Sequence, residues 1–203
     1  MELPKFKIIF LGDPGVGKSS ILNRFCQNKF DTDYQATIGL DFHSKNVVIN
    51  KKNIRLNFYD TAGQEKFKSL IPMYIRDANI IIIVFDISSK ITFDHVRSWM
   101  KEIADLKKQD AIVAIVGNKL DLPNKEVSTE DVEGLIKETG SILSTMSAKS
   151  GDGVEYFFEQ LFNEMSRVFN LSGPDQEELN VTEKFDLGKI KQTTKQKRKC
   201  CKN

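Results

Sequence analysis

The sequence predicts an α/β fold with a six-stranded, mostly parallel sheet, one antiparallel edge strand and helices on both faces. Three observations predict it. Short apolar runs rich in β-formers alternate along the 203 residues with amphipathic segments of helical period. One pair of runs is separated by a few polar residues, which is typical of a hairpin. A glycine-rich run directly follows the first apolar segment and opens a helix, as in folds that bind phosphate groups.

The expected strands are short apolar or alternating runs. They cover residues 6–11, 41–49, 54–60, 80–85, 111–116 and 142–146. The run 80–85 is apolar throughout, as expected of a strand covered on both faces. In the run 54–60, apolar and polar residues alternate, so this strand has one face in the core. Residues 50–53 are expected to form the turn of the hairpin.

The expected helices carry apolar residues at spacings of three and four. They cover residues 19–25, 92–108, 128–139 and 154–169, and residues 65–77 have mixed helical character. Trp99 and Met100 are assigned to the core, because large apolar side chains are mostly buried. Ser128 predicts a capped start and Gly140 the end of its helix. The polar residues 28–40 predict a surface loop.

Length and composition indicate one domain over residues 1–170 and a polar, flexible tail over 171–203. No apolar run approaches a membrane span and no secretory signal is visible, so we expect a cytoplasmic protein. Three cysteines are too few for a disulfide framework, and Cys26 is expected to be a buried thiol. From Leu187 onward there are seven Lys or Arg and no acidic residue. Since the whole chain has a net charge of +2, residues 1–186 have a net charge of −5.

The run from Gly12 to Ser19 has the form G-x-x-x-x-G-K-S. Glycines allow backbone N–H groups to converge on phosphate oxygens, and the following helix points its positive end at the same anion. Lys18 can then reach the β- and γ-phosphates, and the Ser19 hydroxyl can ligate Mg²⁺. A glycine-rich turn that binds nothing is the alternative, and this motif alone leaves the nucleotide open.

The run Asn118-Lys119-Leu120-Asp121 indicates which nucleotide base is bound. The two acceptors of the Asp121 carboxylate match the N1–H and N2–H₂ donors of guanine, which adenine lacks. The apolar stem of Lys119 can lie along the base. An ATP-dependent kinase or ATPase is therefore disfavoured. These loops, with Asp60 and Ser147, follow strand ends at one edge of the expected sheet, where such folds bind ligands.

Together with residues 60–65 (Asp-Thr-Ala-Gly-Gln-Glu) and Ser147-Ala148-Lys149, these motifs have the order and spacing of the Ras-like small GTPases, which the chain resembles over about residues 5–169. The resemblance implies a P-loop NTPase fold, GTP or GDP with Mg²⁺ as ligands, and hydrolysis of GTP. No arginine is evidently placed to act on the γ-phosphate. Slow hydrolysis, accelerated by an activating protein as in Ras itself, is therefore expected.

The resemblance also implies roles for single residues. Ser19, Thr37 and Asp60 are expected to hold Mg²⁺. Gln64 is expected to orient the attacking water, with Lys18 and Thr37 as the other catalytic residues, while contacts from Thr37 and Gly63 to the γ-phosphate hold two loops. The expected nucleotide-binding residues are Asp13, Gly15, Val16, Gly17, Lys18, Ser19, Ser20, Phe30, Tyr34, Thr37, Gly63, Asn118, Lys119, Asp121, Ser147, Ala148 and Lys149. Of these, Phe30 resembles the ring beside the guanine and Ala148 the backbone donor to its O6.

Residues 34–42 resemble a Rab, and residues 69–77 resemble the Golgi-associated Rab-six branch. The resemblance implies a role in vesicle trafficking, with effector proteins binding through Phe42, Tyr59, Tyr74 and the loops at 35–42 and 62–77. An exchange factor, an activating protein and a prenyl-binding chaperone of the GDI type are the other implied partners.

The chain departs from the Rab pattern at three places. Tyr59 stands where tryptophan is usual and is expected to reshape the effector surface. Thr145-Met146 replaces a common Glu-Thr before Ser147, with a mild expected effect. Pro14 removes a backbone N–H beside the γ-phosphate, which motivates an alternative function, a GTP-binding module with very low hydrolysis that is regulated by exchange.

The tail ends in Cys200-Cys201, which resembles the doubly geranylgeranylated ends of Rabs. Two lipid chains hold a protein stably on a membrane, and nearby lysines attract an anionic leaflet. We therefore expect a peripheral protein on the cytosolic face of Golgi or other endomembranes. A solvated basic tail or a nucleic-acid arm is the alternative, and no nucleic-acid partner is expected. His43 and His95 are interpreted as surface polar residues without motif partners.

Overall fold

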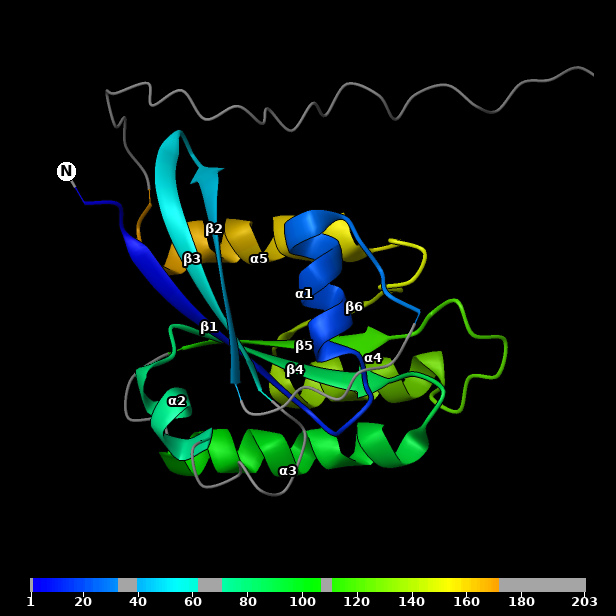
Figure 1. Cartoon of the computed structure of the whole chain (residues 1–203). Coiled ribbons are helices and arrows are strands. Elements are labelled where there is room, and N and C mark those ends of the chain that lie inside the picture. Colours follow the sequence, from blue (N-terminus) through cyan, green and yellow to red (C-terminus); the bar gives the residue numbers. More distant parts are fainter. Residues whose placement is uncertain (1, 33–39, 62–70, 107–110, 172–203) are drawn as a thin grey trace, which may run out of the picture.

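The computed structural model describes residues 2–32, 40–61, 71–106 and 111–171. In this part of the chain six strands form one sheet in the order β2-β3-β1-β4-β5-β6 (Figure 1). The strands are β1 (Lys5–Leu11), β2 (Leu40–Ile49), β3 (Lys52–Thr61), β4 (Ile80–Asp86), β5 (Ile112–Asn118) and β6 (Ile142–Thr145). Neighbouring strands are parallel except β2 and β3. The predicted antiparallel edge strand is therefore confirmed.

The helices of the described ranges cover both faces of this sheet. They are α1 (Lys18–Gln27), α2 (Ile71–Asp77), α3 (Lys90–Leu106), α4 (Thr129–Thr139) and α5 (Val154–Val168). Helices α1 and α5 lie on one face and α2, α3 and α4 on the other (Figure 1), each side enclosing its own apolar core. Every residue of β4 is buried, because this central strand has a helical layer on each face. Among the described helices, none is long and apolar enough to cross a bilayer.

The turn between β2 and β3 is tighter than predicted. Ile49 pairs with Lys52, so the turn consists of Asn50 and Lys51 alone rather than residues 50–53. Both residues have positive φ, 50° and 67°, which is the backbone of a two-residue turn whose twist matches that of the strands. The pattern was missed because lysine rarely occupies such a position. The Asn50 side chain also hydrogen-bonds to Ser166 of α5.

Helix α3 begins at Lys90, two residues before the predicted start. The Thr92 hydroxyl explains the longer helix, because it accepts a hydrogen bond from the Asp86 N–H (3.0 Å) and contacts the Ser89 carbonyl oxygen (2.9 Å). These contacts hold the first turn where side-chain periodicity gives no signal. Residues 65–70 and 107–108 of the predicted helices lie outside the described residues. Cys26 is half-buried against the core, and its burial raises the pKa of the thiol.

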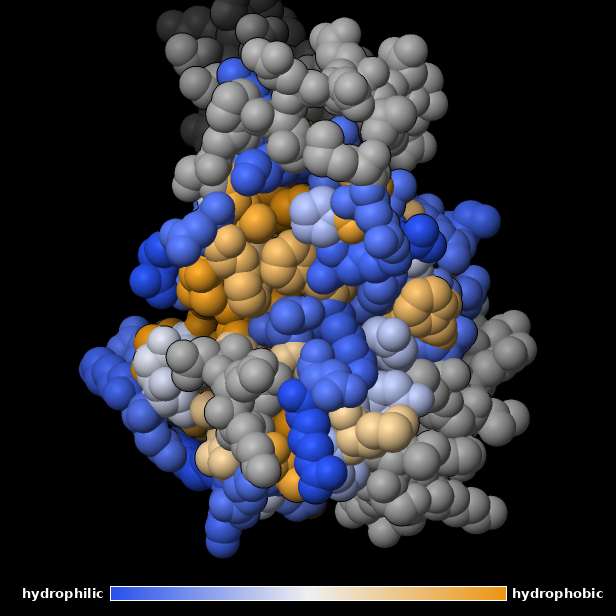
Figure 2. Space-filling model, turned by 90° about the vertical axis from the view of Figure 1, so that its left-hand side faces the viewer, coloured by the Kyte–Doolittle hydropathy of each residue, from blue (hydrophilic) through white to orange (hydrophobic). Residues whose placement is uncertain are grey.

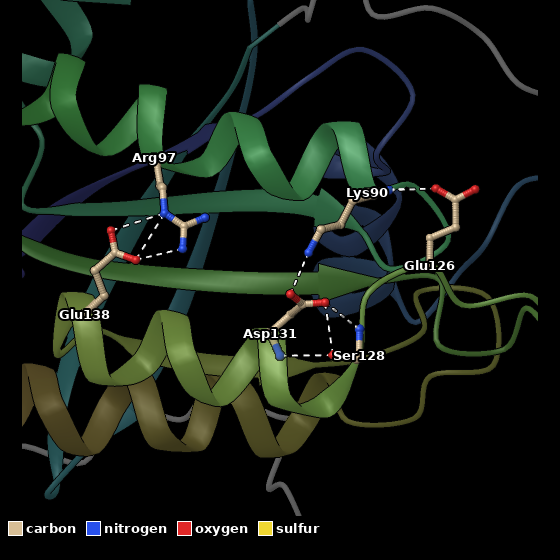
Figure 3. A network of polar contacts seen from close by, with 6 residues as sticks. All are labelled: Lys90, Arg97, Glu126, Ser128, Asp131 and Glu138. Atoms are coloured by element: carbon tan, nitrogen blue, oxygen red, sulfur yellow. Dashed lines mark hydrogen bonds and ion pairs between the residues drawn. The ribbon is translucent and has the colours of Figure 1, made fainter.

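Two ion pairs join α3 to α4 (Figure 3). Arg97 Nη2 lies 2.7 Å from Glu138 Oε2, and Lys90 Nζ lies 2.6 Å from Asp131 Oδ1. Asp131 also completes the N-terminal cap of α4, because its carboxylate accepts the Ser128 N–H (3.0 Å) while the Ser128 side chain accepts the Asp131 N–H (3.1 Å). The hydrogen bond from Lys90, with those from Ser128, lowers the pKa of Asp131 to about 2.

This shift predicts a pH dependence of stability. The folded pKa of Asp131 lies below its ordinary value of 3.8, so its contribution is complete above about pH 4 and is lost as the pH falls toward about 2. We expect Asp131→Asn to lower the urea midpoint of unfolding at pH 6. The difference in midpoint between the variant and the native protein is expected to shrink as the pH falls from about 4 to about 2. The exposed Asp105→Asn serves as the control. An equal difference at all pH values contradicts the prediction.

Candidate nucleotide-binding site

The loop from Gly12 to Lys18 connects the end of β1 to the start of α1. Its last glycine, Gly17, is the N-cap of α1 and has φ of 97°. A Cβ at this position would lie 2.3 Å from Asn118 Nδ2, so only glycine allows the loop to pass this close to the end of β5. The loop therefore turns directly into a helix N-terminus, where unpaired backbone N–H groups favour an anion.

Lys18 holds its ammonium group inside this loop. The residue is only 5% exposed, and Nζ donates to the carbonyl oxygens of Gly12 (2.8 Å) and Asp13 (2.9 Å). Burial lowers the pKa of Lys18 to about 8, although the charges of Asp60 and Asp13 act in the opposite direction. A buried cation that is costly to keep charged gains most from a polyanion beside it. Lys18 is thus suited to a phosphate group.

The residues present fit a magnesium ion. Asp60, at the end of β3, is 2% exposed and accepts a hydrogen bond from the Ser19 hydroxyl. Its Oδ1 atom is buried and has no hydrogen-bond partner among the residues that the structure describes. Burial raises the pKa of Asp60 against the opposing effects of Ser19 and Lys18. A buried carboxylate oxygen beside a hydroxyl is the oxygen donor set that Mg²⁺ prefers. A bound ion here would supply charge for a phosphate.

Asn118 joins the loop from Gly12 to Lys18, here called the phosphate loop, to the loop after β6. It is 2% exposed, its Nδ2 donates to the Val16 carbonyl oxygen (2.9 Å) and its Oδ1 accepts the Ala148 N–H (3.0 Å). Because one buried side chain bonds to both loops, their separation is fixed. The structure therefore places the two loops side by side at one edge of the sheet.

Asp121 and Lys119 are each held by a partner. The Ser147 hydroxyl donates to Asp121 Oδ1 (2.6 Å). Lys119 Nζ lies 2.7 Å from Asp86 Oδ2. Burial would raise the pKa of Asp86, but the hydrogen bonds from Lys119 and Ser88 outweigh it and hold this pKa below its ordinary value.

Comparison with known families agrees with this geometry. The family model described as Ras family matches residues 7–167, which is most of the chain. The chain belongs to the Ras family. As a Ras-family protein it carries a guanine-nucleotide-binding GTPase domain that acts as a switch, and the six-stranded sheet is the fold of that family.

Most of the predicted site residues of this Ras-family protein lie in the described ranges. The phosphate loop, the end of β3 and the loops after β5 and β6 bring together Asp13, Gly15, Val16, Gly17, Lys18, Ser19, Ser20, Asp60, Asn118, Lys119, Asp121, Ser147, Ala148 and Lys149. Phe30 is half-buried and packs against the core on the α1 and α5 side of the sheet. The other predicted residues lie outside the described residues: Tyr34, Thr37, Gly63, Gln64, Cys200 and Cys201.

His95 is a surface residue as predicted, with 52% of its side chain exposed, but the interpretation that it has no motif partner is wrong. His95 Nδ1 lies 2.6 Å from Asp13 Oδ2, and the Trp99 indole N–H contacts Asp13 Oδ1 at 3.4 Å. Helix α3 therefore holds the second residue of the phosphate loop through both carboxylate oxygens. Trp99 also packs against the core as predicted. His43, in contrast, lies 3.0 Å from Asp41 on the edge strand β2, and it makes no contact with the loop from Gly12 to Lys18 that the described residues show.

Two further residues of the site were missed. Asp86 binds Lys119, and its place at the end of an apolar strand was the available signal. Arg24 contacts the loop after β6 from helix α1, and its surroundings in the sequence give no signal for this contact.

Proposed function

We propose that this Ras-family protein is a Rab-type switch that hydrolyses GTP with Mg²⁺ and recruits effector proteins to membranes of the Golgi or related compartments. In this proposal residues 1–170 bind the nucleotide through the predicted site residues, and the tail 171–203 carries lipid groups on Cys200 and Cys201. An exchange factor and an activating protein set the nucleotide state, and a prenyl-binding chaperone extracts the GDP form.

The observation that carries the Rab assignment is a group of aromatic rings from three elements. The Tyr59 ring of β3 lies 5.3 Å from that of Phe42 on β2 and 5.5 Å from that of Tyr74 on α2. Lys7 Nζ lies 4.9 Å and 4.8 Å from the centres of the two tyrosine rings. Tyrosine in place of tryptophan therefore keeps the rings in contact, which supports an effector surface here.

Met73, which precedes Tyr74 on α2, also exposes a large apolar side chain. Figure 2 shows the side of the molecule that lies on the left of Figure 1, where apolar side chains gather between hydrophilic ones. The exposed large apolar residues of β2 and α2 are Phe42, Val48 and Met73. Exposed aromatic and methionine side chains near a polar rim are typical of protein-binding surfaces.

Single-turnover hydrolysis tests the switch. We expect the protein loaded with GTP and Mg²⁺ to hydrolyse it alone at roughly 10⁻⁴ s⁻¹ and about 10³- to 10⁵-fold faster with a Rab activating protein. Gln64→Leu is the control that keeps nucleotide binding and loses the acceleration. Hydrolysis at several per second by the protein alone contradicts the proposal.

Localisation of the full chain tests the membrane part. We expect the native chain on internal membranes of its cell and a Cys200→Ser, Cys201→Ser variant in the cytosol, because two lipid chains supply stable anchoring. The same distribution for both proteins contradicts the anchor. Intact mass of the native chain shows how many lipid groups are present.

A second candidate function is a GTP-binding module with very low hydrolysis that is regulated by exchange. Pro14 favours it, because proline offers no N–H beside the γ-phosphate, and the neighbouring Asp13 is fixed to α3 by His95. The hydrolysis experiment separates the two functions, because this candidate gives no acceleration with an activating protein. Pro14→Gly is then expected to restore it.

A further inference from the structure

Arg24 of α1 makes hydrogen bonds to the loop that follows β6. Its Nε atom donates to the Ala148 carbonyl oxygen (2.9 Å) and its Nη2 atom to that of Lys149 (2.7 Å). Its Nη1 atom donates to the backbone and side-chain oxygens of Asn28, both at 3.0 Å. One guanidinium group thus bridges the end of α1 and the loop after β6.

The backbone geometry shows why two carbonyl groups face Arg24. The loop closes on itself through the Ser147 N–H to the Asp152 carbonyl oxygen (2.9 Å) and the Gly151 N–H to that of Ser147 (2.8 Å). Within this closed loop the carbonyl oxygens of Ala148 and Lys149 point at α1, while the Ala148 N–H points at Asn118. A Cβ built on Gly151 would lie 3.9 Å from Arg24 Cδ, so the arginine stem also packs against the loop.

We propose that Arg24 is a positioning residue for the guanine base, which fixes the loop 147–149 and so sets how long a guanine nucleotide stays bound. The inference rests on the proposed use of this loop to bind guanine. Asn118 holds the loop from the side of the sheet, and Arg24 holds it from the side of α1. The planar guanidinium bonds to the two adjacent carbonyl oxygens through two separate nitrogen atoms, Nε and Nη2, in a fixed geometry that an ammonium group does not have.

The consequence of losing Arg24 follows from the bonds of the loop. Without the guanidinium, the Ala148 and Lys149 carbonyl groups turn toward water, and Ala148 is held only by the hydrogen bond of its N–H to Asn118. Ser147, which holds Asp121, lies in the same closed loop. Hydrogen bonds to a charged group in a partly exposed site contribute enough for about a tenfold change in a rate. We therefore expect GDP to dissociate about tenfold faster from Arg24→Met.

The experiment measures the dissociation rates of fluorescent GDP and of the corresponding inosine diphosphate. The inosine base lacks the 2-amino group from which Asp121 is expected to accept a hydrogen bond. It uses the full chain with Mg²⁺. In Arg24→Met we expect faster GDP dissociation, a smaller preference for GDP over the inosine nucleotide, and an unchanged rate of hydrolysis of bound GTP. Arg24→Lys keeps the positive charge but loses the two separate donor atoms of the guanidinium, and it is expected to give an intermediate rate. The change in base preference is the readout that a general loss of stability does not produce.

The matched control is Arg167→Ala, which removes an arginine of α5 that pairs with the nearby Glu164. We expect native dissociation rates for it. Native dissociation of GDP from Arg24→Met overturns the proposal, and so does an equal acceleration for both nucleotides. If the native chain binds neither nucleotide, the proposed function itself fails, whereas failure of Arg24 alone leaves native binding intact.

Discussion

Replacing Lys18 by methionine is expected to weaken GDP binding by about 10²- to 10³-fold, because it removes the cation from a buried charge pair with phosphate. The Lys18 residue is 5% exposed, and its ammonium already bonds to two loop carbonyl oxygens. A phosphate in the loop therefore meets a charge that is fixed before binding. Such a preformed contact loses little entropy when the ligand arrives.

The same substitution is expected to leave the nucleotide-free protein at least as stable. Burial lowers the pKa of Lys18 to about 8, which shows that its charge is unfavourable there without an anion. An apolar side chain of similar length has no charge to desolvate, so this cost is absent. Titration with fluorescent GDP and unfolding of the nucleotide-free protein measure the two effects. The exposed Lys101→Met is the control. GDP affinity within a few-fold of the native value contradicts the first expectation.

The sheet and the placement of the site followed from local sequence patterns. Continuous apolar runs such as residues 80–85 identify strands that are covered on both faces. Because parallel strands end at the same edge, the loops after them could be grouped from the order of the strands along the chain. The capping residue Ser128 also gave the start of α4 to within one residue.

The connections between these loops could not be predicted. Arg24 and Ala148 are 124 residues apart, and His95 and Asp13 are 82 apart. Periodicity gives the face of a helix on which a side chain lies but not the loop that this face meets. The turn at Asn50 and Lys51 was misplaced for a local reason, since lysine carries no signal for a positive φ.

Replacing Gly12 by alanine is expected to reduce the free energy of unfolding by about 3 kcal/mol or more. A Cβ at this position would lie 2.2 Å from the Val84 carbonyl oxygen, far inside van der Waals contact. Val84 belongs to β4, the buried centre of the sheet, so neither backbone can move without breaking strand pairs. The φ of Gly12, 133°, adds a conformational cost that alanine cannot avoid.

The variant Gly15→Ala separates the effect of the steric clash on stability from the effect of the positive φ. Gly15 also has a positive φ, 76°, but a Cβ there would meet no atom within 4 Å. Gly15→Ala is therefore expected to reduce the free energy of unfolding by about 1–2 kcal/mol, because of the backbone conformation alone. Urea unfolding of both variants in the nucleotide-free state, where ligand affinity does not contribute, measures the difference. Equal losses would mean that β4 yields to the added methyl group, and that the close approach of the phosphate loop to the sheet does not require glycine.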